Sequence, residues 1–468
     1  MSFVSIEFAI LFILTFILLV IVKSPTGRKQ ILLIASCVFY AAWDWRFLFL
    51  LALLTVVIYL LSQSIVKSQD KHDRKLKLIV GIVFSLSILI FFKYFNFFTD
   101  NLNAILTLFG WKISSLNILL PIGISFFTFE ILSYLIDVYR GLTQPAKSML
   151  DYAVFITFFP RLISGPIIRA NQFLPQVERG IQINFPNFME GMQKFIQGLI
   201  KKLVVADSLS VMVDQIFSLP IQFSSATVWL GVLAYTVQVF CDFSGYIDMA
   251  TGISKILGFD LPINFNLPYT AQSITDFWRR WNISLSSWFR DYVFIPLEMK
   301  RRKVKHLRSQ TNIMVVFLLT GLWHGANWNF VIWGGMHGIY LIVERFITGG
   351  HPIPTVWKSP WSWLRAIVTY LLVTFAIVFF RSPGLNTTGL IFSKLFFLSP
   401  AGFDWFYQSA IIFVPFFILG GWIYRSFEGK IQFPTISYPV QFSVMALEIL
   451  FIFFFASLNV SPFIYFQF

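Results

Sequence analysis

Long apolar stretches, separated by short polar segments, run through the whole chain. A helix that crosses a membrane needs about 20 mostly apolar residues, because the hydrocarbon core of a bilayer is about 30 Å thick. Spans are predicted near residues 6–22, up to 43, 47–65, 78–98, 119–137, 152–163, 192–216, 228–251, 313–346, 363–380, 410–424 and 442–458. We therefore expect an all-α integral membrane protein with about eleven transmembrane helices, plus re-entrant or interfacial helices around a central cavity.

Three details of the pattern refine this expectation. Stretch 313–346 is too long for one crossing, so the helix is expected to break near Asn327 to Asn329. The first stretch lacks a basic segment before it and a small-residue cleavage site after it, which indicates a retained helix and not a signal peptide. Because neither a short repeat nor a polar domain is visible, residues 1–468 are interpreted as a single multi-pass membrane domain.

Composition and charge agree with a membrane protein. The 468 residues are 57% hydrophobic and 12% charged, with a mean hydropathy of +0.73, which excludes a soluble globular protein of ordinary composition. The net charge of +14 comes from basic residues in short loops between the apolar stretches. This is where the positive-inside rule places them, so the N-terminus is expected outside and nucleic-acid binding is not expected.

The cysteines do not form a recognisable framework. Cys37 and Cys241 both lie in apolar surroundings, where a free thiol behaves as a small hydrophobic side chain. We interpret both as buried thiols, and we expect no disulfide and no metal site.

Polar residues inside apolar spans cost free energy and therefore need an explanation. Glu130, Tyr134 and Asp137 follow each other at helical spacing, so they share one inward face. Because buried charges are usually paired, we favour a hydrogen-bonded network with Arg161 or Arg169 over a functional role.

A second polar face occurs in the stretch AYTVQVFCDFSGYIDMA. Gln238, Asp242 and either Gly245 or Tyr246 lie on it. Asp242 either orients a catalytic group or serves as a structural anchor, and both interpretations stay open.

The stretch SITDFWRRWNISLSSWFRDY, residues 273–292, is typical of an interfacial amphipathic helix. One face is aromatic and apolar, with Trp278, Trp281, Leu285, Trp288 and Tyr292. The other face is polar, with Arg279, Asn282, Ser286 and Arg290. Tryptophans suit the headgroup boundary, so the helix either lies in the membrane surface without a chemical role or binds an anionic group through its arginines.

The basic run KRRKVKHLR, from Lys300 to Arg308, follows directly. Such a run suits the phosphates of a nucleotide-bearing donor. Topology alone explains it, and we favour that interpretation.

His324 lies in TGLWHGANWNF, deep in an apolar stretch. With a rise of about 1.5 Å per residue from Thr311, it lies roughly 20 Å inside the membrane core and needs a partner or a cavity. Gly321 with Gly325, and Gly334 with Gly338, have the spacing of a close helix crossing. The nearby His337 is expected to form a hydrogen bond across that crossing.

Several long motifs together resemble the membrane-bound O-acyltransferase family. They are PIGISFFTFEILSYLIDVYRG, FFPRLISGPIIR, VFCDFSGYIDMATGISKILGFDLPINFNLPY, DFWRRWNISLSSWFRDYVFIPL, LLTGLWHGANWNFVIWGGMHGIYL and PFIYFQF. The similarity is greatest to the bacterial branch that includes the alginate O-acetylation membrane subunit and the teichoic-acid D-alanylation membrane protein.

The resemblance implies acyl transfer with His324 as the catalytic residue and Asn282 as a second catalytic position. Similar bacterial chains have RRWHIS where this chain has RRWNIS. An amide cannot accept a proton at neutral pH, so His324 is expected to act as the base while Asn282 donates a hydrogen bond. Further substrate contacts are expected from Trp278, Arg279, Ser286, Trp323, Asn327 and Asp242.

By the same resemblance the chain is expected in the bacterial cytoplasmic membrane, without a bound cofactor. It would transfer an acetyl group from acetyl-CoA, by way of an extracytoplasmic acyltransferase or directly, to a cell-surface or secreted polysaccharide. One alternative is transfer of another acyl group, such as D-alanyl from a carrier protein. The other is a proton-coupled transporter whose path contains Glu130, Asp137, Asp242 and His324.

Overall fold

The computed structural model describes residues 1–300, 307–353, 355, 357, 359–427, 437–459 and 461–464, with the backbone alone for residues 300, 307 and 308. All regular elements among these residues are helices. One isolated bridge joins Phe223 to Phe403. The expected all-α fold is therefore confirmed. The basic run from Lys300 to Arg308 falls almost wholly outside the described residues.

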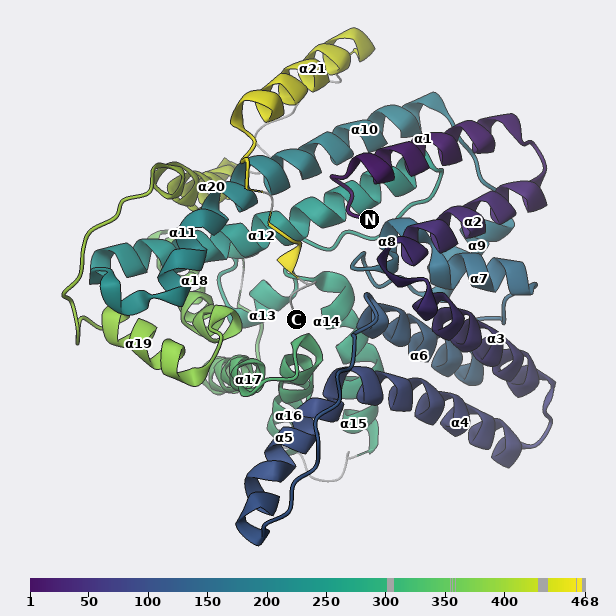
Figure 1. Cartoon of the computed structure of the whole chain (residues 1–468), viewed down its shortest axis with the longest axis horizontal. Helices are drawn as coiled ribbons and strands as arrows, with labels where there is room; N and C mark the ends of the chain where they lie inside the picture. Colours follow the sequence, from purple (N-terminus) through teal and green to yellow (C-terminus); the bar gives the residue numbers. More distant parts are fainter. Residues whose placement is uncertain are drawn as a thin grey trace. The chain divides into compact units, whose positions relative to one another are not determined.

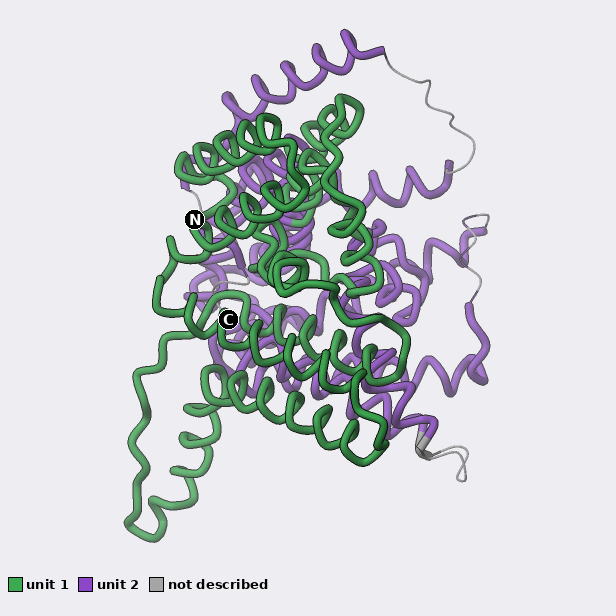
Figure 2. The backbone as a smooth tube through the Cα atoms, turned by 90° about the vertical axis from the view of Figure 1, so that its right-hand side faces the viewer, with its two compact units in different colours: residues 1–195, 247–262 green, residues 196–246, 263–468 purple. Residues whose placement is uncertain are grey.

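The chain divides into two compact units, which Figure 2 shows in green and purple. Unit 1 consists of Met1–Phe195 and Ile247–Pro262, and unit 2 of Ile196–Tyr246 and Ile263–Phe468. The organisation as a single domain stays a prediction.

Unit 1 contains the helices of the N-terminal part of the chain (Figure 1). They are α1 (Ile6–Ile21), α2 (Pro25–Asp44), α3 (Arg46–Lys67), α4 (Lys71–Leu89), α5 (Phe95–Leu106), α6 (Ile124–Arg140), α7 (Met149–Thr157), α8 (Phe159–Leu162), α9 (Ala170–Glu178) and the start of α10 (Phe185–Leu199). A π-helical segment, Ile90–Tyr94, joins α4 to α5, and a 3₁₀ turn, Thr107–Phe109, follows α5.

Helix α6 carries the polar face that the sequence predicts, and nearly all of its residues are buried. Glu130 forms a buried ion pair with Arg161, whose guanidinium also lies over the rings of Phe155 and Phe173. The prediction of a buried network with Arg161 is confirmed.

Tyr134 takes part in the same face of α6. Its hydroxyl lies 2.9 Å from Ser62 Oγ and accepts a hydrogen bond from the backbone N–H of Ala146 at 3.1 Å. Asp137, which shares the face, is 5% exposed. The polar residues of α6 therefore belong to the interior of unit 1.

Unit 2 contains the remaining helices. They are α11 (Asp207–Ser218), α12 (Ser225–Ile256), α13 (Ile274–Trp278), α14 (Ile283–Phe289), α15 (Ile295–Lys300), α16 (Leu307–His324), α17 (Trp328–Thr348), α18 (Pro360–Arg381), α19 (Leu385–Leu395), α20 (Gln408–Phe427) and α21 (Tyr438–Phe455). Helix α12 belongs to unit 2 as far as Tyr246, and its remaining residues belong to unit 1. Two π-helical segments, Ile200–Ala206 and Arg290–Phe294, precede α11 and α15. Short 3₁₀ turns lie at Pro220–Gln222 and Pro268–Thr270.

Seven helical segments of the described chain are long and apolar enough to cross a membrane. They are Arg46–Lys67, Lys71–Phe109, Ser225–Ile256, Trp328–Thr348, Pro360–Arg381, Gln408–Phe427 and Tyr438–Phe455. Stretch 152–163, predicted as a span, is instead two short helices, because Pro160 lies in the first turn of α8 and starts a new helix there. The protein is a multi-pass membrane protein, and the count of eleven crossings stays a prediction.

Candidate active site

The structure corrects the expectation of one amphipathic helix over residues 273–292. Helix α13 ends at Trp278, and α14 begins only after a turn at Asn282. Asn282 has the left-handed backbone angles φ 43° and ψ 56°, which cannot continue a right-handed helix. Trp278, Trp281 and Trp288 are buried in the protein, and Tyr292 is partly exposed. The prediction of one continuous amphipathic helix is therefore wrong, and the position of the segment at the membrane surface stays a prediction.

Hydrogen bonds determine which end of the Asn282 amide is available to a ligand. The backbone N–H of Ser284 donates to Asn264 Oδ1 at 2.9 Å, so Asn264 directs its Nδ2 toward Asn282. This Nδ2 donates to Asn282 Oδ1 at 3.2 Å. The Nδ2 group of Asn282 is buried and has no hydrogen-bond partner among the described residues. The site thus holds a buried N–H donor in a fixed orientation.

The backbone at residue 282 limits which amino acids fit there. Left-handed angles are strained for most residues, whereas asparagine, aspartate and histidine adopt them several times more often. Asn282 and the histidine that the family resemblance implies at this position both belong to that group. The two residue types are therefore interchangeable for the backbone, and both can donate a hydrogen bond.

His324 is the last residue of α16, at the connection to α17. Asn327 caps α17 by accepting a hydrogen bond from the backbone N–H of Asn329 at 2.9 Å. The break predicted near Asn327 to Asn329 is therefore confirmed.

Glycines allow the backbones of α16 and α17 to touch. A Cβ atom added to Gly321 would lie 2.2 Å from the carbonyl oxygen of Phe330. One added to Gly334 would lie 2.2 Å from that of Phe317. Any larger residue would push the helices apart, so the close crossing predicted from the glycine spacing is confirmed.

Aromatic rings surround His324, which is 4% exposed. The ring centroids of Trp323 and Trp333 lie 4.9 Å from that of His324, and that of Phe380 lies 5.1 Å from it, all in edge orientation. Beside His324 is a cavity of about 20 Å³, the inner cavity. It is lined by Val239, Tyr269, Phe277, Trp281, His324, Trp333, His337, Val373, Ile377 and Phe380.

A second cavity of unit 2, the outer cavity, has a volume of about 500 Å³. It is lined by Thr275, Trp278, Arg279, Ile283, Leu285, Ser286, Ser287, Phe289, Arg290, Phe294, Ile313, Val316, Phe317, Thr320 and Leu341. Three of the residues predicted to contact substrate therefore line the same cavity: Trp278, Arg279 and Ser286. The indole N–H of Trp278 is buried there without a hydrogen-bond partner among the described residues.

Asn282 lines neither cavity, but its two neighbours in the chain each line one of them. Its neighbour Trp281 lines the inner cavity, and its neighbour Ile283 lines the outer cavity. His324 faces the inner cavity from α16. The two residues predicted to be catalytic thus belong to the same small region of unit 2, and their catalytic roles stay a prediction.

Two other predicted substrate contacts line neither cavity. Trp323 is buried against His324, and Asn327 caps α17. Both residues therefore support the position of His324 in the fold, and a direct substrate contact stays a prediction for each.

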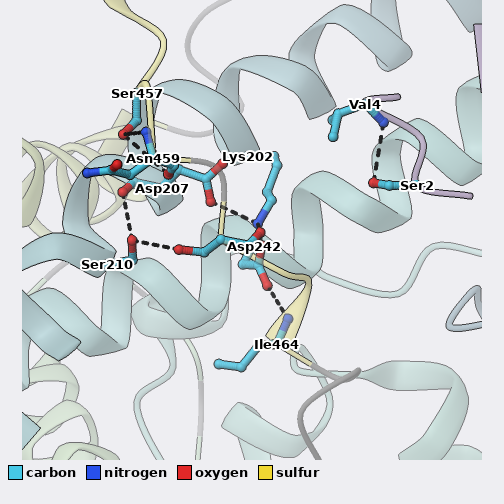
Figure 3. A network of polar contacts seen from close by, with 10 residues as sticks. Ser2, Val4, Lys202, Asp207, Ser210, Asp242, Ser457, Asn459 and Ile464 are labelled. Atoms are coloured by element: carbon cyan, nitrogen blue, oxygen red, sulfur yellow. Dashed lines mark hydrogen bonds and ion pairs between the residues drawn. The ribbon is translucent and has the colours of Figure 1, made fainter. Parts of the chain in front are cut away.

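Asp242 has a different environment, shown in Figure 3. Lys202 Nζ lies 2.8 Å from Asp242 Oδ1 and 2.8 Å from Asp207 Oδ1. Asp242 Oδ2 accepts a hydrogen bond from the backbone N–H of Ile464 at 2.8 Å, and Lys202 donates to the carbonyl oxygen of Ser461 at 2.7 Å. The cluster therefore holds the C-terminal segment, which supports the interpretation of Asp242 as an anchor.

Two residues of the site have roles that the sequence did not predict. Asn264 orients Asn282 across 18 positions of the chain, and its own sequence surroundings give no signal of this role. His337 lines the inner cavity and forms no hydrogen bond with a described residue, so the expected bond across the helix crossing is not found. Within the described residues, no group of three or more His, Cys, Asp or Glu side chains is placed to hold a metal ion.

Comparison with known proteins gives consistent matches. The model of the membrane-bound O-acyltransferase family matches residues 37–386. The probable alginate O-acetylase of Pseudomonas aeruginosa is 42% identical over 398 residues, which is 85% of this chain and 75% of that protein. The peptidoglycan O-acetyltransferase of Helicobacter pylori is 38% identical over 80% of this chain and 74% of that protein.

A teichoic acid D-alanyltransferase from Bacillus subtilis is 29% identical over 56% of this chain and 68% of that protein. The family match covers most of the chain and includes both the turn at Asn282 and the hairpin that carries His324. The protein belongs to the membrane-bound O-acyltransferase family.

Proposed function

We propose that the protein transfers an acetyl group from acetyl-CoA to hydroxyl groups of a cell-surface or secreted polysaccharide. The observation that carries this proposal is the combination of a buried histidine, a buried amide donor and two cavities in one unit of an O-acyltransferase. The names of the relatives, an alginate O-acetylase and a peptidoglycan O-acetyltransferase, support acetyl as the group and a glycan as the acceptor.

The proposed reaction needs only His324 and Asn282 as chemical groups. His324 accepts the proton of the acceptor hydroxyl while the hydroxyl oxygen attacks the thioester carbonyl carbon. The oxyanion that forms accepts a hydrogen bond from Asn282 Nδ2. When the carbonyl re-forms, the carbon–sulfur bond breaks, and the thiolate takes the proton from His324. An ester and a free thiol leave, and the histidine is neutral again.

The outer cavity suits the donor. Its volume of about 500 Å³ lies within the range of small-molecule sites, and its lining is largely apolar. Arg279 and Arg290 supply two positive charges at its border, which would attract the phosphates of CoA. Burial of the thioester away from water would also prevent its hydrolysis.

The charges around the cavities favour acetyl over D-alanyl. No carboxylate lines either cavity among the described residues, and the Asp291 carboxylate beside the outer cavity is already paired with Arg290 at 2.8 Å. The ammonium group of a D-alanyl donor would therefore find no unoccupied counter-ion there. The two arginines of the outer cavity would repel it. An acetyl group is neutral and meets neither obstacle.

The transporter alternative receives no support from the polar residues on which it depends. Glu130 is paired with Arg161, and Asp242 is paired with Lys202. We place the protein in the bacterial cytoplasmic membrane with its N-terminus outside, and we expect an extracytoplasmic acyltransferase or the polysaccharide itself to take the acetyl group.

The test uses purified protein in lipid nanodiscs, with release of free thiol as the measurement. Acetyl-CoA with an added polysaccharide should release CoA, and D-alanyl carrier protein should release none. The His324→Ala variant in the same nanodiscs is the control for spontaneous hydrolysis. Thiol release from D-alanyl carrier protein alone would contradict acetyl transfer, and equal release by His324→Ala would contradict enzymatic transfer at this site.

A further inference from the structure

His337 is a second histidine in the inner cavity. It lies on α17, is 1% exposed and lines the cavity together with His324. Its ring centroid lies 4.9 Å from that of Trp333, which lies at the same distance from His324. The two imidazoles therefore flank one indole ring and face one small space.

The imidazole of His337 has no hydrogen-bond partner among the described residues. Its other neighbours are aromatic faces and edges, with Trp278 at 5.1 Å and Phe277 at 6.2 Å between ring centroids. A neutral imidazole carries one donor and one acceptor, and leaving a buried polar group unpaired costs about 1 to 3 kcal/mol. A leucine would fill the position without this cost. The polar ring at this position therefore indicates a guest in the cavity.

The size and lining of the inner cavity define that guest. A cavity needs about 10 to 15 Å³ to hold one water molecule, and this one measures about 20 Å³. A buried water also needs at least two polar partners. The hydroxyl of Tyr269 already donates to the carbonyl oxygen of Thr236, and the indoles of Trp281 and Trp333 can only donate. The two imidazoles are therefore the lining groups that can both donate and accept.

We propose that His337 is a positioning residue, which acts on His324 through a water molecule held in the inner cavity. The water accepts a hydrogen bond from one imidazole and donates one to the other. Because the bond made at one ring nitrogen fixes the tautomer and orientation of the whole ring, His337 keeps His324 ready to accept the hydroxyl proton. This inference rests on the proposed function for the role of His324.

Two substitutions separate this role from simple packing. His337→Leu keeps an apolar side chain of similar size, and His337→Gln keeps a donor and an acceptor. Partners that orient metal-bound histidines typically contribute about 10- to 100-fold, and we expect an effect of the same order for His324. We expect His337→Leu to lower kcat by about that factor with the KM for acetyl-CoA unchanged, and His337→Gln to retain most of kcat. Thr388→Val is the control, because the buried Thr388 hydroxyl donates to the carbonyl oxygen of Gly384, which caps the same helix, and lines neither cavity.

Thermal unfolding of the same variants gives an independent readout. Because the ring binds the protein only through the water, His337→Leu should leave the melting temperature unchanged or higher, while its kcat falls. Wild-type kcat in His337→Leu would contradict the proposal. So would a lower melting temperature or loss of folded protein in that variant, because the ring would then be stabilising. If the wild-type enzyme were inactive with acetyl-CoA, the proposed function would be refuted. The melting temperature of His337→Leu would still show whether the His337 ring stabilises the fold.

Discussion

Two buried polar clusters of this protein differ in whether their hydrogen bonds are made. In unit 1, Glu130 is paired with Arg161, and Tyr134 contacts Ser62 and Ala146, although Arg161 Nε has no hydrogen-bond partner among the described residues. At the site in unit 2, the buried groups without a hydrogen-bond partner among the described residues include Asn282 Nδ2, the indole N–H of Trp278 and Nδ1 of His337. Both clusters occur in apolar helical surroundings, so burial alone does not distinguish them.

The difference has an energetic meaning. A buried charge or hydrogen-bonding group that finds its partner within the protein gains stability from it, or at least avoids the cost of desolvation. A group left unpaired lowers stability and remains able to bind a substrate, a water or a developing charge. The comparison therefore predicts that substitutions in unit 1 affect folding, and that substitutions in unit 2 affect turnover.

The largest effect on turnover is expected for His324→Ala. Loss of a general base lowers rates by about 10² to 10⁴, so transfer should become undetectable or nearly so while the amount of protein in the membrane stays the same. The measurement is CoA release per folded molecule in nanodiscs. His337→Ala should cost much less, and equal losses in the two variants would contradict the role given to His324.

Substitutions of Asn282 should have the next largest effect. Loss of a hydrogen-bond donor to an oxyanion costs about 10² to 10³ in kcat, so Asn282→Ala should fall by that factor at saturating donor. Asn282→His should retain measurable activity, because imidazole also donates. Asn282→Asp should be poor, because a carboxylate lacks the donor and repels the oxyanion.

A backbone control accompanies this series. Alanine is strained at the left-handed angles of residue 282, whereas glycine adopts them freely. Asn282→Gly therefore isolates the loss of the amide and should match Asn282→Ala in kcat while it unfolds at a higher temperature. Wild-type turnover in Asn282→Gly would show that the amide serves only the local fold.

A smaller effect is expected for the arginines of the outer cavity. Replacement of Arg279 and Arg290 by Gln should raise the KM for acetyl-CoA about threefold to tenfold, since an exposed charge contributes only about 0.2 to 1 kcal/mol. The value of kcat should not change, and added salt should reduce the difference. Arg425→Gln is the control, because Arg425 lines neither cavity. An unchanged KM would mean that the donor lies elsewhere.

The smallest effect on turnover, and the largest on stability, is expected for Arg161→Met. This change leaves Glu130 buried without its partner, which typically costs about 3 to 5 kcal/mol of folding free energy. Turnover per folded molecule should stay at the wild-type value. The double variant Arg161→Met with Glu130→Gln should recover part of the lost stability, and a loss of turnover in it would overturn the comparison.

The features predicted well from the sequence depend on residues near one another in the chain. The inward face of α6 follows from the spacing of Glu130 and Tyr134, and the break after His324 follows from length and the asparagines that cap helices. The glycine spacing likewise predicts the close crossing of α16 and α17. Each of these signals lies within one helix or one hairpin.

The features that were missed depend on contacts across long stretches of chain. Helical periodicity over residues 273–292 favours one helix, but the hydrogen bond from Asn264 supports the left-handed turn at Asn282. The sequence leaves the role of Asp242 open, because the contact that supports an anchor comes from Ile464, 222 positions later. The isolation of His337 depends on which neighbours surround it in space, and no local pattern reports that.

The most direct test of the central claim is mass analysis of surface and secreted glycans from cells with the wild-type protein, His324→Ala or no protein. The two proteins should be present in the membrane at equal levels. We predict acetyl esters on a polysaccharide in wild-type cells alone. Acetyl esters at the same level in the His324→Ala cells, or another acyl group in place of acetyl in wild-type cells, would contradict the account.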